Sequence, residues 1–129
     1  MHKSFLKIAA LLAMLAVILG AFGAHALKAL ATDTVIAVFE TGVRYQMYHA
    51  IGLFIVGILY KEYGSKILQW AGCLFIAGIV LFSGSLYLLT FIKAIDNASF
   101  LWVGAITPLG GACFIAGWGL IVTTIAKAR

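Results

Sequence analysis

Several side chains that could do chemistry lie close together in residues 40–52 of this chain. Arg44 could bind an anionic group, and His49 could exchange a proton near neutral pH or bind a metal. On a continuous helix, residues four apart lie on one side, so the polar members of this segment form a single stripe. The stripe comprises Glu40, Thr41, Arg44, Tyr45, Tyr48, His49 and Gly52. This pattern indicates a binding face for a polar or anionic group.

Glu40 and Arg44 carry opposite charges four residues apart, with the acid first. This is the favourable order for an ion pair within a helix. A charge inside the hydrocarbon of a membrane costs about 2.5–3.5 kcal/mol on insertion scales, so a charge at that depth indicates a function. The alternative is that both residues lie at the level of the outer lipid headgroups, where they pair with each other or extend into water.

Other polar residues are expected at the same depth as this stripe, near the outer ends of neighbouring helices. Together they form a predicted ligand-binding site that faces inward between the helices. The site consists of His25, Glu40, Arg44, Tyr45, Tyr48, His49, Ser83, Ser85 and Thr107. We expect its polar groups to contact the head of a lipid-like or small amphiphilic molecule, or to stabilise the membrane. The alternative is an accessory subunit that packs against a larger membrane complex.

No motif in the chain indicates catalysis, a metal or a cofactor. The sequence has no P-loop, GxSxG or HExxH motif and no paired carboxylates, so we expect that it is not an enzyme. His25 and His49 could hold a haem between two helices, but histidines at such positions more often form hydrogen bonds. Cys73 and Cys113 are expected at different depths, too far apart for a disulfide, as small buried residues.

The composition shows which elements must position these residues. The chain has 129 residues, of which 64% are hydrophobic and 10% charged, and its mean hydropathy is +1.13. Soluble domains have about 25% charged residues, so this composition indicates an integral membrane protein. Stretches of about 20 apolar residues predict transmembrane helices at approximately 5–26, 43–60, 67–91 and 101–126. Short links between them predict a single all-α domain, residues 1–129, built as an antiparallel four-helix bundle.

The distribution of Lys and Arg predicts the orientation of the bundle. The net charge is +5, but the cations are scattered among apolar runs, so we expect membrane lipids and not nucleic acid as partners. One side of the predicted bundle carries Lys3, Lys7, Lys61, Lys66, Lys127 and Arg129, and the other carries Lys28, Arg44 and Lys93. Positive residues favour the cytoplasmic side, so both termini are expected there. Alternatively, Ala24-His25-Ala26 ends a cleaved signal sequence, although the apolar run is long for one.

Two connections leave structural alternatives open. A short amphipathic segment precedes the second helix, with Thr32 or Asp33 as its cap; it is either an interfacial helix or an extension of the span, and Gly42 is a plausible bend. In the fourth stretch, Pro108 either kinks a helix that begins near Leu101 or occupies the first turn of a helix capped by Thr107.

Small residues predict where the helices pack closely, because membrane helices associate through such residues. They line one side of the first helix and recur seven apart in the third. These positions are Ala9, Ala13, Ala16, Gly20 and Ala24, and Ala71, Gly78 and Ser85. Such a face can also support a homo-oligomer. The predicted structural residues are Gly20, Gly23, Gly78, Pro108, Gly110 and Gly111.

Several short motifs occur in order along nearly the whole chain. They are GAFGAH at 20–25, FETGVRYQMYH at 39–49, FSGSLY at 82–87, TPLGG at 107–111 and Gly117-Trp118. The sequence resembles the YgdD/YwdK-like small membrane proteins, a family of unknown function of the DUF423/UPF0382 type. The resemblance implies an uncleaved first span and a bacterial inner-membrane protein, or a mitochondrial one in eukaryotes, and it supplies no reaction or cofactor.

Overall fold

The computed structural model describes residues 1–127 of the chain. Its elements are α1 (Lys3–His25), η1 (Leu27–Ala29), α2 (Asp33–Tyr63), α3 (Lys66–Gly78), η2 (Ile79–Ser83), α4 (Gly84–Ala94), η3 (Ala98–Ala105) and α5 (Thr107–Lys127). Arg129, one of the cations counted above, lies outside the described residues. The prediction of an all-α protein built from four helical rods is confirmed.

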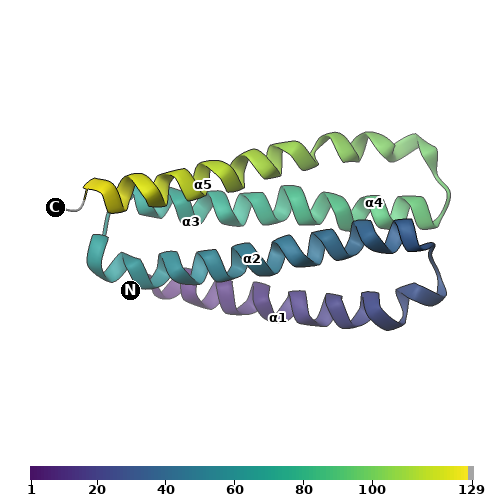
Figure 1. Ribbon diagram of the computed structural model, residues 1–129, viewed down its shortest axis with the longest axis horizontal. Coiled ribbons are helices and arrows are strands. Elements are labelled where there is room, and N and C mark those ends of the chain that lie inside the picture. Colours follow the sequence, from purple (N-terminus) through teal and green to yellow (C-terminus); the bar gives the residue numbers. More distant parts are fainter. Residues whose placement is uncertain (128–129) are drawn as a thin grey trace.

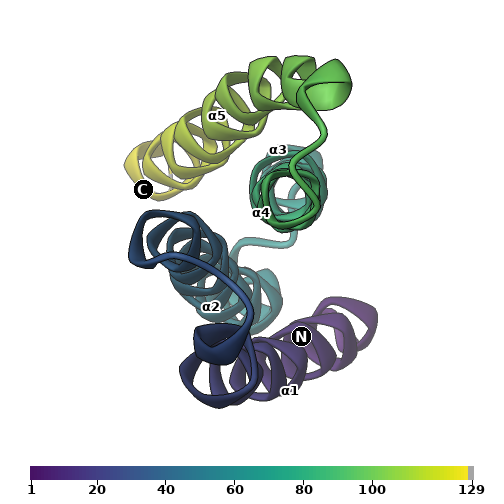
Figure 2. The same cartoon turned by 90° about the vertical axis from the view of Figure 1, so that its right-hand side faces the viewer.

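The rods are α1, α2, the continuous run from α3 through η2 to α4, and η3 with α5 (Figure 1). Seen end-on, α2 lies between α1 and the α3–α4 rod, and α5 packs on the far side of that rod (Figure 2). We call the end where α1 begins and α5 ends the proximal end, and the opposite end the distal end. Lys3, Lys61 and Lys127 lie at helix ends on the proximal side, whereas Lys28 and Lys93 lie on the distal side.

Three of the rods are long and apolar enough to cross a membrane within the described part of the chain. They are Lys3–Ala29, Lys66–Ala94 and Ala98–Lys127. The fourth rod, α2, runs beside them over their length but is less apolar (Figure 1). The reason is local, because its first half carries Glu40, Arg44 and Gln46.

The amphipathic segment is the first part of α2 and not a separate interfacial helix. The Thr32 hydroxyl accepts a hydrogen bond from the Val35 N–H, and the helix continues without interruption to Tyr63. The predicted bend at Gly42 is therefore wrong. Gly42 instead lets α2 pass close to α4, because a Cβ at this position would lie 2.8 Å from Cε1 of Tyr87.

The structure also decides between the alternatives at Pro108. A 3₁₀-helix, η3, precedes the proline, and α5 begins at Thr107. In the first turn of a helix the missing N–H of proline removes no internal hydrogen bond, so Pro108 starts α5 without kinking it. The Thr107 hydroxyl hydrogen-bonds with Ser85 Oγ at 2.7 Å, which joins α5 to α4.

The α3–α4 rod contains one turn of π-helix, η2, near its middle. There the N–H of Gly84 donates to the carbonyl of Ile79, five residues earlier. Such a turn inserts an extra residue and rotates the side chains that follow it. Ser83, the last residue of the turn, is fully buried and donates its hydroxyl to the Gly42 carbonyl of α2 at 2.7 Å.

The main core lies in the middle and proximal part of the bundle. Leu53, Leu68 and Phe75 are completely buried there, and Gly78 and Gly110 let α5 approach α3 and η2. A second, smaller cluster at the distal end contains Leu27, Ile36 and Phe39. The other predicted structural glycines pack less tightly or against this second cluster: Gly23 faces Phe39, Gly20 touches Val43, and Gly111 lies at the edge of Phe82.

Candidate functional site

The structure divides the predicted site residues into an inward and an outward group. His49, Ser83 and Ser85 are buried and Thr107 is half-buried, whereas His25, Glu40, Arg44, Tyr45 and Tyr48 are exposed. These residues are therefore not brought together in one inward-facing pocket. A helix turns by about 100° per residue, so residues 40, 44 and 48 lie on a different side of α2 from residues 42, 46 and 49.

The exposed group also lacks the predicted ion pair. Glu40 and Arg44 are both exposed, and no ion pair joins them in the structure of residues 1–127. The prediction of an intrahelical pair is therefore not borne out by the side-chain positions. Tyr45 packs on Phe82 of η2, with the ring centroids 4.6 Å apart, and Tyr48 lies beside Tyr45 at 6.0 Å.

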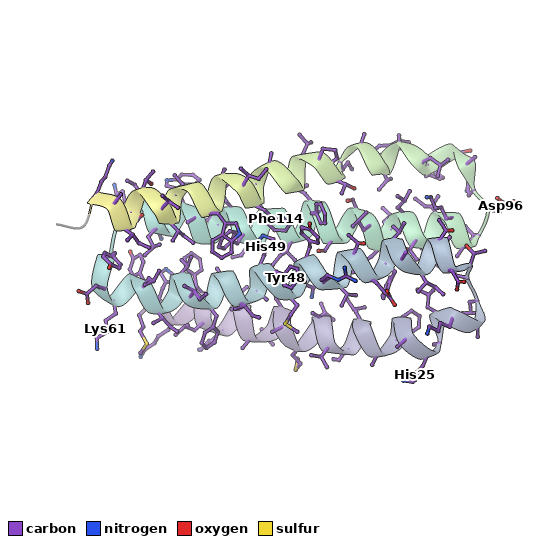
Figure 3. All side chains as sticks on the ribbon, in the orientation of Figure 1. His25, Tyr48, His49, Lys61, Asp96 and Phe114 are labelled. Carbon is purple, nitrogen blue, oxygen red and sulfur yellow. The ribbon has the colours of Figure 1, made fainter. Side chains whose placement is uncertain are left out.

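His49 is 6% exposed and lies midway along the bundle, not in its outer half (Figure 3). Its Nδ1 lies 2.8 Å from the Tyr45 carbonyl, and a carbonyl only accepts, so Nδ1 carries the proton. The imidazole stacks on Phe114, with the ring centroids 3.4 Å apart and the planes at 7°. This packing fixes the ring between α2 and α5.

The structure does not place His25 and His49 where the two could hold one haem. His25 is exposed at the distal end of α1, whereas His49 lies midway along the bundle, so the two are at different depths (Figure 3). Among the described residues there is also no cluster of three or more His, Cys, Asp or Glu that could hold a metal. Both cysteines are free thiols; Cys73 is exposed and Cys113 half-buried, so the expectation that both are buried was wrong.

Gln46 is the polar residue that the sequence reasoning missed. It is 2% exposed, and its Nε2 donates to the Leu12 carbonyl of α1 at 2.9 Å. Its Oε1 accepts from the Tyr87 hydroxyl of α4 at 2.7 Å. A signal was present, because an amide inside a membrane span must find hydrogen-bond partners within the protein. Gln46 thus joins three helices.

The buried hydroxyls make similar links. Ser85 uses its single hydroxyl proton to donate to the Phe82 carbonyl at 2.9 Å. In the contact between Ser85 and Thr107, the Thr107 hydroxyl is therefore the donor. Within residues 1–127, no fully buried side-chain nitrogen or oxygen lacks a hydrogen-bond partner. Gln46, Ser83 and the Ser85–Thr107 pair therefore link neighbouring helices, whereas His49 bonds to a carbonyl of its own helix.

A cavity of about 430 Å³ lies at the distal end, between α1, η1, α2 and α4. Its lining is almost entirely apolar: Phe22, Leu27, Leu30, Phe39, Tyr87, Thr90, Phe91, Ala94 and Ile95. The two hydroxyls in this lining are engaged, Tyr87 with Gln46 and Thr90 with the Leu86 carbonyl. The volume falls within the range of small-molecule sites, roughly 300–1,000 Å³. None of the predicted site residues lines this cavity.

Two exposed cations lie on the segments that line the cavity. Lys28 stands between the lining residues Leu27 and Leu30, and Lys93 between Phe91 and Ala94. The distal end thus combines an apolar cavity with positive charge near the predicted membrane surface.

The fold, the apolar helix surfaces and the buried polar links define a helical membrane protein with several candidate spans. Comparison with known families agrees: the family described as "Protein of unknown function (DUF423)" matches residues 19–111, and the chain belongs to it. The predicted family is therefore confirmed.

The curated relatives are bacterial membrane proteins. UPF0382 membrane protein YwdK of Bacillus subtilis is 50% identical over 97% of this chain and 98% of its own length. A UPF0382 membrane protein of Staphylococcus haemolyticus is 43% identical over 97% of each chain. No solved structure matches the chain. These names establish a membrane protein of this family and no specific activity.

Proposed function

We propose that this protein binds a lipid-like or small amphiphilic molecule in the distal cavity, without catalysing a reaction. The observation that carries the proposal is the cavity of about 430 Å³ with an almost wholly apolar lining. An acyl chain fits such a lining, because the lining is apolar and no fully buried side-chain polar group of residues 1–127 is left unpaired. Tyr87 and Thr90 donate their hydroxyl protons to other groups of the protein, which supports binding over chemistry.

The head of the bound molecule would lie at the distal membrane surface. Lys28 and Lys93 are exposed on the segments that line the cavity, so they favour an anionic head group. In this arrangement Arg44 and His49 do not contact the head group, because neither lines the cavity. The proposed ligand is thus of the kind predicted from the sequence, but its binding site is the distal cavity and not the predicted polar site.

We further propose that both termini face the cytoplasm of a bacterial cell, in its cytoplasmic membrane. The sorting of lysines between the two ends supports this orientation, with Lys3, Lys61, Lys66 and Lys127 at the proximal end. The cavity then opens toward the outer leaflet. A cysteine in place of Asp96, in the distal connection, should react with an impermeant maleimide added to intact cells; protection of this cysteine in intact cells, and its reaction only after lysis, would contradict the orientation.

The binding proposal is tested by native mass spectrometry of the protein purified in a mild detergent. Ala94→Trp places a large side chain in the cavity, and Ala112→Trp adds the same bulk on an exposed position of α5. We expect a retained amphiphile in the natural protein and in Ala112→Trp, and a several-fold loss in Ala94→Trp. A protein that retains no amphiphile, or equal retention in both variants, would refute the proposal.

The head-group preference has a separate readout. Replacement of both Lys28 and Lys93 by Gln should lower the retention of an anionic lipid several-fold and leave a zwitterionic lipid of the same chain length unchanged. If both lipids are retained equally well by the natural protein, the assignment of an anionic head is wrong even where chain binding persists.

A further inference from the structure

A second apolar cavity lies beside the first at the distal end of the bundle. It has a volume of about 380 Å³ and lies between α4, the connection that follows it and η3. Its lining residues are Leu88, Phe91, Ile92, Ile95, Asn97, Phe100, Trp102, Val103 and Ile106. This volume also falls within the range of small-molecule sites. The distal end therefore has room for more than one apolar group.

The two cavities share one wall. Phe91 and Ile95 line both of them, and these residues lie about one turn apart on α4 with 63% and 55% of their surface exposed. Successive residues of a helix are turned by about 100°, so Ala94 in the first cavity and Leu88 in the second lie on opposite sides of this row. Only a single row of side chains on the outer surface of α4 thus separates the cavities.

Both cavities lie at the same height along the bundle. The two residues that they share belong to the last turn of α4 and its C-cap. Two apolar chains placed in them would therefore lie in the same leaflet of the membrane. This is the arrangement of the two acyl chains of one lipid molecule, which leave a common head group side by side.

Polar groups lie at the distal end of the second cavity, where a head group is expected. Asn97 follows Asp96, which lies at the distal tip of the bundle (Figure 3). The Oδ1 of Asn97 accepts a hydrogen bond from the Ser99 N–H at 3.1 Å, and its Nδ2 can donate to a ligand. Trp102 is 63% exposed, and tryptophan is enriched at the level of lipid head groups.

We propose that the ligand of the distal end is one anionic lipid with two acyl chains, of which one occupies each cavity. This inference rests on the proposed function, because it assigns the first cavity to one of the two chains. Lys28 and Lys93 favour the anionic head, and Asn97 can donate to a phosphate or ester oxygen above the second chain. One two-chain lipid is favoured over two single-chain molecules, because the second chain then binds without a second loss of translational freedom.

Native mass spectrometry with two lipids of the same head group and chain length tests the proposal. The probes are phosphatidylglycerol, which has two acyl chains, and lysophosphatidylglycerol, which has one. We expect the natural protein to retain one phosphatidylglycerol per chain, several-fold more strongly than lysophosphatidylglycerol. Equal retention of the two lipids would overturn the proposal, because the second acyl chain would then contribute nothing. This comparison requires no variant.

A variant of the second cavity locates the second chain. Leu88→Trp adds bulk in that cavity alone, and Leu109→Trp is the matched control on α5, where Leu109 is 61% exposed and lines neither cavity. Leu88→Trp should lower the retention of phosphatidylglycerol several-fold and leave that of lysophosphatidylglycerol unchanged, which also shows that the variant is folded. The control should retain both lipids as the natural protein does.

Failure of this inference is distinguishable from failure of the proposed function. Equal retention of phosphatidylglycerol in Leu88→Trp and Leu109→Trp would overturn the second chain site, whereas binding in the first cavity would still be lost in Ala94→Trp. A polypeptide that co-purifies with the natural protein in place of lipid and is lost in Leu88→Trp would also overturn it. A natural protein that retains neither lipid would refute both proposals.

Discussion

In the middle of the bundle, Gly78 and Gly110 let α5 pack closely on α3 and η2, because the Phe114 ring lies against Gly78 and the backbone of Phe82 lies against Gly110. At the distal end, large apolar side chains of α1, α2 and α4 face one another across a cavity of about 430 Å³. Small residues and hydrogen bonds between helices hold membrane helices together, whereas apolar side chains gain little by leaving lipid. The middle of the bundle therefore supplies the stability, and the distal end supplies the space that the proposed ligand needs.

The largest effect is expected where the packing is tightest. In Gly110→Ala the new methyl group would meet the backbone nitrogen of Phe82, and overpacking of this kind costs about 1–3 kcal/mol. Gly119→Ala on the same helix is the matched control, because nothing lies within 4 Å of its Cβ position, and it should be neutral or stabilise by up to about 1 kcal/mol. Equilibrium unfolding in mixed detergent micelles measures both. Equal changes in the free energy of unfolding of the two variants would show that the close approach of α5 to η2 does not contribute to stability.

The next effect is expected at Gln46. Gln46→Leu leaves the Leu12 carbonyl and the Tyr87 hydroxyl without their partner, which costs about 1–3 kcal/mol. Tyr87→Phe should cost about 0.6–1.7 kcal/mol, the range for hydrogen bonds between membrane helices. The double variant should cost less than the two single variants together, because the second substitution removes a hydroxyl that is already unpaired. Additive effects would indicate that the two side chains are not coupled.

A smaller loss is expected at the π-helical turn. Ser83→Ala removes the hydrogen bond to the Gly42 carbonyl and should cost about 0.6 kcal/mol. Thr123→Ala is the control, because this hydroxyl is exposed and bonds only to a carbonyl of its own helix, Leu120. The same unfolding measurement applies. A Ser83→Ala variant as stable as the control would mean that this bond does not hold α2 against η2.

The smallest stability effect is expected at the cavity. Ala94→Trp fills space without removing a contact, so its free energy of unfolding should change by no more than about 0.5 kcal/mol, measured on protein stripped of lipid. Combined with the expected loss of bound amphiphile, this result would separate binding from stability. A large destabilisation by Ala94→Trp would instead place the distal end in the structural core.

The sequence predicted an all-α protein of four helices, because apolar length and short links determine this feature directly, and the ordered motifs predicted the family. The limits of the second helix were less accurate, since α2 begins at Asp33 and not near residue 43. The amphipathic segment remained open as either a separate helix or part of α2, since the residues alone do not show whether the chain turns at Gly42. The structure shows why residue 42 is a glycine: the Tyr87 ring of α4 lies where a Cβ at this position would be.

The predicted site was less accurate, for a physical reason. Hydropathy places a residue at a height along the bundle, but it does not show which side of its helix faces a neighbour. Arg44 and Tyr48 were therefore grouped with His49, although they are exposed and His49 is buried, and Gln46 was overlooked. The cavity could not be predicted either, because it depends on how the side chains of α1, α2 and α4 fail to fill the space between them.

The most direct test of the proposed function is a density map of the protein determined in lipid. The account predicts elongated non-protein density between Phe39, Tyr87 and Phe91, with its polar end toward Lys28 and Lys93. A distal end closed by these side chains, with no density between them, would contradict it.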